Sequence, residues 1–117
     1  MKMNFNPPMP TVVKRAPNAA MALAALDDAA TLREVAKTLK REGLWEKQRA
    51  QVLHAAVAAG SEDVVEYLLE DATTDEVERE YEWVDWKLYE QAYGNQRDST
   101  LVINYRGVRN LLRTFLH

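Results

Sequence analysis

Residues 53–69, with the sequence LHAAVAAGSEDVVEYLL, decide how the chain folds. Alanine, valine and leucine lead up to Gly60, which stops a helix because glycine accepts the left-handed backbone that ends one. Ser61 is a favoured helix cap, and Glu62 and Asp63 follow in the first turn, where the helix dipole stabilises negative charge. The stretch predicts two consecutive helices joined by a tight turn.

The same pattern occurs earlier in the chain, at a spacing of thirty residues. The alignment pairs Leu23 with Leu53, Ala25 with Ala55, Ala30 with Gly60, Thr31 with Ser61, Val35 with Val65 and Leu39 with Leu69. A helix pair of this size cannot bury its apolar face alone, so neighbouring pairs must stack against each other. The repeat therefore predicts a series of stacked helical hairpins.

This stretch resembles the helical part of an ankyrin repeat. Leu53-His54 stands where that family opens its first helix, and the apolar core of the second helix is matched by Val64-Val65 and Leu68-Leu69. Small residues (Ala55 and Ala56) and a turn glycine lie between them. The resemblance implies stacked antiparallel hairpins that bind another protein, and a structural hydrogen-bonding role for the histidine at a helix start.

The resemblance is strong over about twenty residues and weaker elsewhere. Gln51-Val52 replaces the Thr-Pro that the family carries before the leucine, and the expected Asp-x-x-Gly turn is missing, so the projecting β-turn of the family is in doubt. Ala24 stands where the first unit should have its histidine. A third unit could open at Leu88-Tyr89 and close at Val108 and Leu111-Leu112, with an irregular insertion between. A convergent helical-hairpin array is the alternative to a degenerate ankyrin-like stack.

Caps and apolar periodicity predict a single all-α domain over 18–117, with about six helices. A helix follows Asn18, Thr31 caps a second that Gly43 ends, and the hairpin at 46–72 supplies two more. Thr73 and Glu76 form a capping-box pattern for a long helix ending near Gly94, and Ser99 or Thr100 can cap the last. Residues 100–105 are also rich in strand formers, but a lone strand has no partner, so helix is favoured.

All four prolines lie within residues 1–17, which are expected to form an extended or disordered arm.

The chain has no cysteine, which excludes disulfides and thiolate metal sites. No apolar run is long enough for a membrane span or a signal peptide. We therefore expect a cytoplasmic protein, with the nucleus as the alternative.

Charge is unevenly distributed along the chain, although its net value is only −3. Residues 62–90 hold twelve Asp/Glu against two Lys/Arg, whereas 1–61 and 91–117 are both mildly basic. An acidic block of this kind is either solvated helix surface or a face that steers toward a basic partner.

Catalysis and metal binding find little support in the sequence. His54 is the only interior histidine, and His117 is the only other. Carboxylate pairs such as Asp27 with Asp28 and Glu76 with Glu80 are expected on exposed faces, whereas acid–base catalysis needs one desolvated carboxyl group. No phosphate loop or nucleophile elbow is present. We expect no enzyme activity, no metal and no cofactor.

A helix-turn-helix is a further alternative, with 31–44 as its first helix and 45–58 as the reader. The reader would display Lys47, Gln48, Arg49 and Gln51, which suit phosphates and base edges. The acidic block opposes this because it repels nucleic-acid phosphates. A solvated basic edge, formed by Lys37, Lys40, Arg41, Lys47 and Arg49, is the simpler interpretation.

The long helix at 74–94 carries more aromatic residues than one face can hold. Tyr81, Val84, Leu88 and Ala92 share one face, whereas Trp83 and Trp86 lie on another that Tyr89 and Tyr93 continue. One set should be buried, and the other is either core or an interface. We select Glu82, Trp83, Asp85, Trp86 and Tyr89 as partner-binding residues, because Trp and Tyr are frequent in binding hot spots.

These patterns favour a non-catalytic protein–protein interaction module that binds a basic or amphipathic partner surface through the acidic, aromatic helix. A small inhibitor that mimics nucleic-acid charge, such as one encoded by a phage or mobile element, is the second hypothesis. A homodimer is also compatible with the sequence, since an unfinished repeat stack exposes apolar ends.

Overall fold

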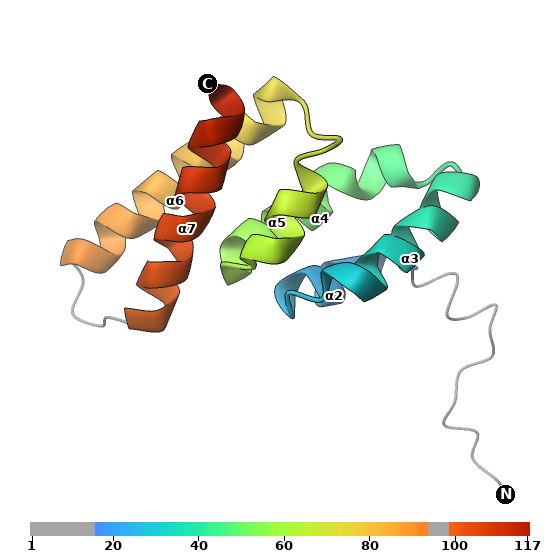
Figure 1. The fold of residues 1–117 in the computed structure, drawn as a ribbon, viewed down its shortest axis with the longest axis horizontal. Helices are drawn as coiled ribbons and strands as arrows, with labels where there is room; N and C mark the ends of the chain where they lie inside the picture. The colour runs from blue at the N-terminus through green and yellow to red at the C-terminus, as the bar shows by residue number, and fades with distance from the viewer. Residues whose placement is uncertain (1–15, 94–98) are drawn as a thin grey trace, which may run out of the picture.

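The computed structural model describes residues 16–93 and 99–117, which form six α-helices and, within those ranges, no strand (Figure 1). The helices are α2 (Ala16–Ala25), α3 (Ala29–Arg41), α4 (Trp45–Ala59), α5 (Glu62–Leu68), α6 (Thr74–Tyr93) and α7 (Ser99–Leu116). The all-α prediction is confirmed, and residues 100–105 are helical. Residues 1–15 of the predicted arm lie outside the described residues. Its last two positions are helical instead, because proline is tolerated in a first helical turn.

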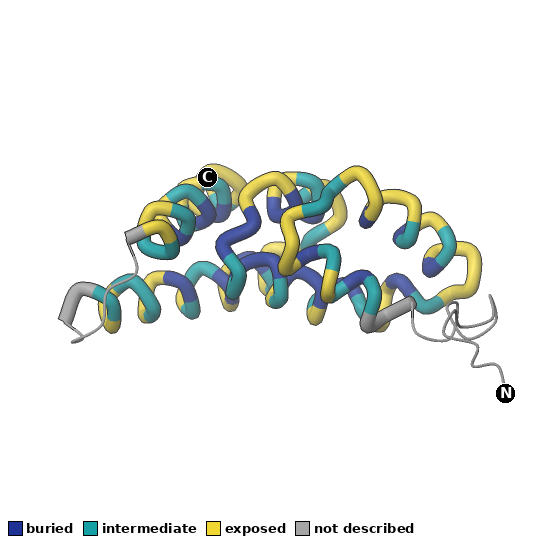
Figure 2. The backbone as a smooth tube through the Cα atoms, turned by 90° about the horizontal axis from the view of Figure 1, so that it is seen from below, coloured by how far each residue is buried: buried dark blue, intermediate teal, exposed yellow. Residues whose placement is uncertain are grey.

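The helices pair into three consecutive hairpins, α2/α3, α4/α5 and α6/α7, that pack side by side. The first helices of the hairpins contact each other in the order α2, α4, α6, and the second helices contact each other in the order α3, α5, α7. The molecule therefore has two layers, with most of its buried residues between them (Figure 2).

The core is almost entirely aliphatic and is centred on the α4/α5 hairpin. Its fully buried side chains are mostly leucine and valine, including Leu32, Leu39, Val52, Leu53, Val57, Val64, Val65, Leu68, Val77, Val84, Val108 and Leu112. The α4/α5 hairpin supplies six of these twelve residues, and five of the six lie within residues 53–69, so this stretch forms the centre of the core.

The turns of the first two hairpins repeat at 33 residues, not at the predicted thirty. Asp27 and Gly60 both adopt a left-handed backbone, with φ of 59° and 71°, and they are 33 positions apart. The residue after each donates its amide to a carbonyl five positions back, Asp28 to Leu23 and Ser61 to Ala56. The thirty-residue alignment was wrong because it sought a small residue, whereas aspartate also tolerates this conformation.

Two helix caps differ from prediction in the same region. Asp28, not Thr31, caps α3, because its carboxylate accepts the Thr31 amide at 3.0 Å. Ser61 makes no side-chain capping bond to α5, and its hydroxyl instead donates to the Ala25 carbonyl at 3.5 Å. The Asp27 carboxylate accepts the Val64 amide at 3.1 Å, so the first hairpin caps the second.

The capping box predicted for α6 is confirmed. Thr73 accepts the amide of Glu76 at 3.2 Å, and the Glu76 carboxylate accepts the amide of Thr73 at 3.1 Å.

Two glycines let α7 lie close to the inner hairpin. A Cβ on Gly60 would meet Asn104 Cβ at 2.7 Å, and a Cβ on Gly107 would meet the Glu62 carboxylate. This close packing of α7 holds the α6/α7 hairpin against the inner hairpin, at one end of the stack.

Candidate interaction surface on helix α6

Helix α6 turns one face toward the core and another toward solvent. Val77 and Val84 are fully buried, and Tyr81 and Leu88 are half-buried, so the predicted inner stripe is confirmed as far as its side chains are described. Ala92 and Tyr93 lie outside the described side chains. The opposite face carries the residues selected from the sequence.

The structure separates Trp83 from Trp86. The Trp83 ring is half-buried and packs edge-on against His54 of α4 and Tyr105 of α7, with centroids 4.9 and 5.9 Å away. Lys87 Nζ lies 5.5 Å from the centroid of the same ring. Trp83 therefore joins α6 to the two helices beside it.

Trp86 and Tyr89 form an exposed aromatic pair. Their rings are stacked, with centroids 5.5 Å apart and planes inclined by 15°. Trp86 is 57% exposed and Tyr89 56% exposed, although large aromatic side chains are normally buried. Such a pair is an apolar platform of the kind that forms hot spots.

Carboxylates surround this pair on the solvent side of α6. The exposed acidic residues of the helix are Asp75, Glu78, Glu82, Asp85 and Glu90. Asp85 Oδ1 lies 3.0 Å from Arg109 Nη1 of α7, and this ion pair links the two helices of the hairpin. Of the five residues selected from the sequence, Glu82, Asp85, Trp86 and Tyr89 share the exposed side, and Trp83 lies apart.

The carboxylates at the other side of α6 are not exposed, contrary to prediction. Glu80 is only 6% exposed, and its Oε1 lies 2.8 Å from His54 Nδ1. Glu76 Oε1 lies 2.9 Å from Arg49 Nη1, and Arg49 is itself buried. This burial could not be predicted from the sequence, because each carboxylate pairs with a residue about 26 positions away on a different helix.

These pairs correct two further expectations. His54 lies in the middle of α4 rather than at a helix start, and it bonds across to α6. Arg49 does not belong to the solvated basic edge and is not displayed by a reading helix, although Lys37, Lys40, Arg41 and Lys47 are exposed as predicted. Both side chains hold the inner hairpin against the last one.

A groove of about 370 Å³ opens beside the His54–Glu80 pair. Met21, Ala50 and Ala55 supply much of its largely apolar lining, and Gln51 and Arg79 also line it. Half of the His54 side chain remains accessible at its edge. This groove crosses the layer formed by α2, α4 and α6.

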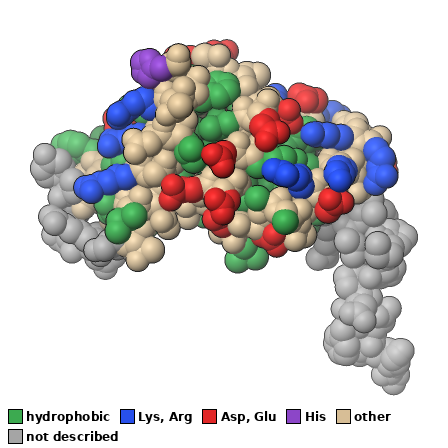
Figure 3. Space-filling view, viewed as in Figure 1, with side chains coloured by type: hydrophobic (Ala, Val, Ile, Leu, Met, Phe, Trp, Pro, Cys, Tyr) green, Lys and Arg blue, Asp and Glu red, His purple; other side chains and the backbone are tan. Residues whose placement is uncertain are grey.

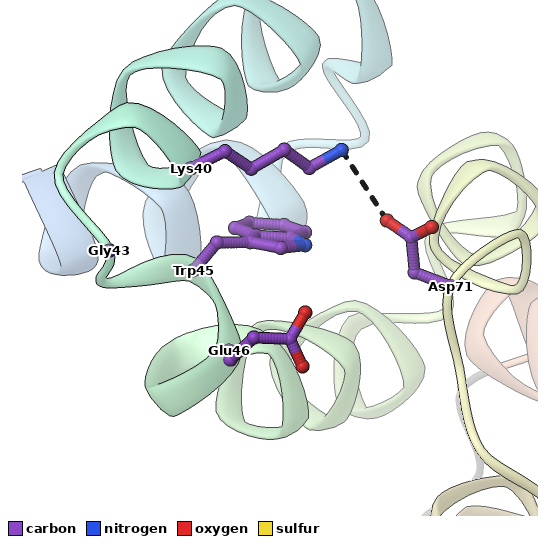
Figure 4. A pocket seen from close by; sticks show the side chains of 5 residues that line it. All are labelled: Lys40, Gly43, Trp45, Glu46 and Asp71. Atoms are coloured by element: carbon purple, nitrogen blue, oxygen red, sulfur yellow. Dashed lines mark ion pairs between the residues drawn. The ribbon is translucent and has the colours of Figure 1, made fainter.

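A second hollow, of about 400 Å³, lies at the opposite end of α4 (Figure 4). Lys40 reaches over the Trp45 ring at 5.7 Å and pairs with Asp71 at 3.5 Å. Glu46 and Gly43 complete the lining. The buried Trp45 Nε1 has no hydrogen-bond partner among the described residues. The ion pair ties the first hairpin to the segment that leads into α6.

Tyr105 closes the seam between α4, α6 and α7. Its hydroxyl donates to the Ala58 carbonyl at 2.8 Å, and the residue is 4% exposed. Burial raises the pKa of Tyr105, because the charged phenolate loses its hydration, and nearby Lys87 offsets part of that effect. This tyrosine is therefore a structural anchor for the last hairpin.

Sequence reasoning missed the arginines of α7. Arg106, Arg109 and Arg113 recur at spacings of three and four, and residues 99–116 contain no Asp or Glu. That spacing places them on one side of a helix. Lys and Arg side chains follow the edge of α7 that faces away from α5 (Figure 3). The spacing of these arginines can be read from the sequence. Their position beside the carboxylates of α6 depends on how α6 and α7 pack.

No protein-family model matches the chain, and neither a curated protein nor a solved structure is significantly similar to it. Among the described residues, no helix combines the length and apolarity needed to cross a membrane, and no cluster of His, Cys, Asp and Glu could hold a metal ion.

Proposed function

We propose that this protein is a non-catalytic interaction module that binds a basic, amphipathic protein segment through the exposed face of α6. The observation that carries this proposal is the stacked Trp86–Tyr89 pair, more than half exposed and flanked by Glu82 and Asp85. An apolar platform with a carboxylate rim has the anatomy of a protein-binding patch, whose aromatic centre gives affinity and whose charged rim steers the encounter.

The charge of the helix defines the chemistry of the partner. Helix α6 contains seven Asp/Glu and two Lys/Arg, and two of the carboxylates, Glu76 and Glu80, are engaged with Arg49 and His54. The other five acidic residues, of which Asp85 pairs with Arg109 and Glu90 with Lys87, surround or precede the aromatic pair on the solvent side. A partner with Lys or Arg beside an apolar stripe complements both features.

A binding experiment with a synthetic amphipathic helix of leucine and lysine tests this proposal. We expect Trp86→Ala to weaken binding, measured by calorimetry, by tenfold or more, about the effect of losing a hot-spot residue. The far-UV circular dichroism should not change, because the ring is mostly outside the core. Ile103→Ala is the matched control, since Ile103 is an exposed apolar residue of α7 at 64% exposure and should leave the affinity unchanged. Equal affinity of Trp86→Ala and the parent protein would refute the proposal.

We also propose that the hairpins are degenerate ankyrin-type repeats. The 33-residue spacing between the Asp27 and Gly60 turns supports this, because 33 residues is the usual length of an ankyrin repeat. An idealised ankyrin capping repeat fused after His117 should stack on the last hairpin and raise the unfolding midpoint. An unchanged midpoint, with the added repeat unfolding separately, would count against ankyrin-type stacking.

Mimicry of nucleic-acid charge is the second candidate function, favoured by helix α5. This helix exposes Glu62, Asp63 and Glu66. Acidic side chains lie together near the middle of the face shown in Figure 3, with basic side chains to either side. Residues 62–68 contain no Lys or Arg. This function requires that DNA or RNA competes with the protein for its partner and that binding is lost as salt is raised. Binding that persists in high salt, and that depends on Trp86, favours the first function.

A further inference from the structure

The last hairpin has an uncovered side, which we call the end face. Helix α6 packs on α4 and α7, and α7 packs on α5 and α6. In the described part of the chain, no helix covers the side away from α4 and α5. The Asp85–Arg109 ion pair marks that side, because Trp83, across the helix from Asp85, contacts His54 of α4.

One half of the end face is acidic. Glu82 lies three positions before Asp85, Tyr89 four after it and Glu78 seven before it, so all three share the side of α6 that carries Asp85. Each of them is exposed. The exposed aromatic pair therefore adjoins this half, since Tyr89 stacks on Trp86.

The other half of the end face is basic. Arg106 and Arg113 flank Arg109 at spacings of three and four, and both are exposed. No carboxylate in residues 99–116 offsets them. The row of blue side chains along the outer edge of α7 shows this half directly (Figure 3).

Partly buried apolar residues adjoin the Asp85–Arg109 pair. Tyr81 and Leu88 lie four positions before and three after Asp85, and Val102 and Leu116 lie seven positions either side of Arg109. All four are of intermediate exposure, because Tyr81, Leu88 and Leu116 also pack against the core. The end face thus has an apolar centre, one acidic side and one basic side.

We propose that the end face binds a second copy of this chain in a symmetric dimer. This rests on the proposed function, because it names the basic, amphipathic partner of α6 as the α7 helix of another copy. A twofold axis parallel to the hairpin places each acidic α6 against the basic α7 of the other copy, twice per dimer. An axis across the hairpin instead sets α6 against α6, which like charges oppose.

The symmetry also fixes which residues meet. A twofold axis along the helices leaves every residue at its own height, and Asp85 and Arg109 are at the same height. Glu82 lies three residues before Asp85 and Arg113 four residues after Arg109, roughly 5 Å along the antiparallel helices in the same direction. Glu82 of one copy therefore faces Arg113 of the other, and Tyr89 faces Arg106.

The area of the end face predicts a reversible dimer. A helix of about twenty residues is roughly 30 Å long, and two helices side by side are about 20 Å wide. Each copy therefore offers on the order of 600 Å², which puts the dimer at the low end of specific interfaces. We expect dissociation in the micromolar range and weakening by salt.

Sedimentation velocity at low salt, over roughly 1 to 500 µM protein, tests the proposal with the full chain. The parent protein should shift from monomer to dimer. Glu82→Lys and Arg113→Glu should each weaken the dimer by tenfold or more, because each sets two like-charge pairs across the axis. An equimolar mixture of the two variants should dimerise again, since both contacts become attractive.

Glu66→Lys on α5 and Lys47→Glu on α4 are the matched controls, because they reverse exposed charges away from the end face. They should leave the dimer unchanged, and circular dichroism verifies that all four variants fold. A chain that stays monomeric at every concentration overturns the proposal. So does a mixture that fails to restore the dimer, or a control that weakens it equally.

These outcomes are distinct from those of the proposed function. A monomeric chain that binds the leucine–lysine peptide through Trp86 retains the proposed function and loses the dimer. A dimer restored by charge exchange, in a protein whose Trp86→Ala variant binds the peptide unchanged, supports the dimer and refutes the proposed peptide site.

Discussion

The inner hairpin α4/α5 and the terminal hairpin α6/α7 differ in how completely they bury their apolar side chains. All the core residues of the inner hairpin, from Val52 to Leu68, are at most 2% exposed. The terminal hairpin buries Val77, Val84, Val108 and Leu112, but it leaves Trp86, Tyr89, Ile103 and Phe115 exposed. The inner hairpin has neighbours on both sides and the terminal one has not. The inner hairpin therefore anchors the core, whereas the terminal hairpin presents large apolar side chains to solvent.

The largest effect should come from a cavity in the inner hairpin. Leu53→Ala should lower the free energy of unfolding by about 3 to 5 kcal/mol, because Leu53 is buried from every side. Leu88→Ala in the terminal hairpin should cost about half as much, since Leu88 is only half-buried. Urea unfolding followed by circular dichroism measures both. Equal losses would show that the two hairpins contribute alike to the core.

A second pair of variants tests how closely the two hairpins approach. Gly60→Ala should cost about 2 to 3 kcal/mol, because it combines a left-handed backbone with a contact of 2.7 Å to Asn104 on α7. Gly43→Ala has the same backbone penalty at φ +73°, but its Cβ meets nothing within 4 Å. Gly43→Ala should therefore cost only about 1 kcal/mol. Unfolding of the two variants at the same urea concentration would show that Asn104 of α7 does not pack tightly against Gly60.

The two tryptophans of α6 should behave differently. Trp83→Ala should lower stability by about 2 kcal/mol, because it removes contacts with His54 and Tyr105 that join three helices. Trp86→Ala should stay within about 0.5 kcal/mol of the parent protein, since its ring is mostly in solvent. Thermal unfolding of the two variants separates a structural from a surface tryptophan. A larger loss for Trp86→Ala would place that ring in the core.

The smallest effect concerns Tyr105 and alkaline pH. Because burial raises its pKa above the usual 10.0, the unfolded chain releases the phenolic proton first as pH rises. The folded state therefore loses stability from about pH 10 up to the folded pKa, and it keeps the full contribution below that range. Tyr105→Phe should remove this loss, at a cost of about 1 kcal/mol at neutral pH from the bond to Ala58. Parallel slopes of stability against pH for both proteins would contradict the assignment.

Much of the fold follows from local patterns in the sequence. Glycines at 43 and 60, the Thr73–Glu76 box and the apolar periodicity located all six helices to within a few residues, because caps and helical faces are set by neighbours along the chain. The exposed aromatic face of α6 was also foreseen as one of two alternatives. Local periodicity could not say which face would be covered, because covering depends on helices far away in the chain.

Residue patterns along the chain are enough to predict helices paired into hairpins, and to show that α6 carries more aromatic residues and carboxylates than one buried face can hold. The 33-residue turn spacing, the burial of Arg49 and Glu80, and the separation of Trp83 from Trp86 depend on how the helices pack. Backbone propensity and capping act over three or four residues, whereas desolvation and charge pairing depend on which helices meet. The acidic and basic halves of the end face are neighbours because the hairpin brings Asp85 to Arg109.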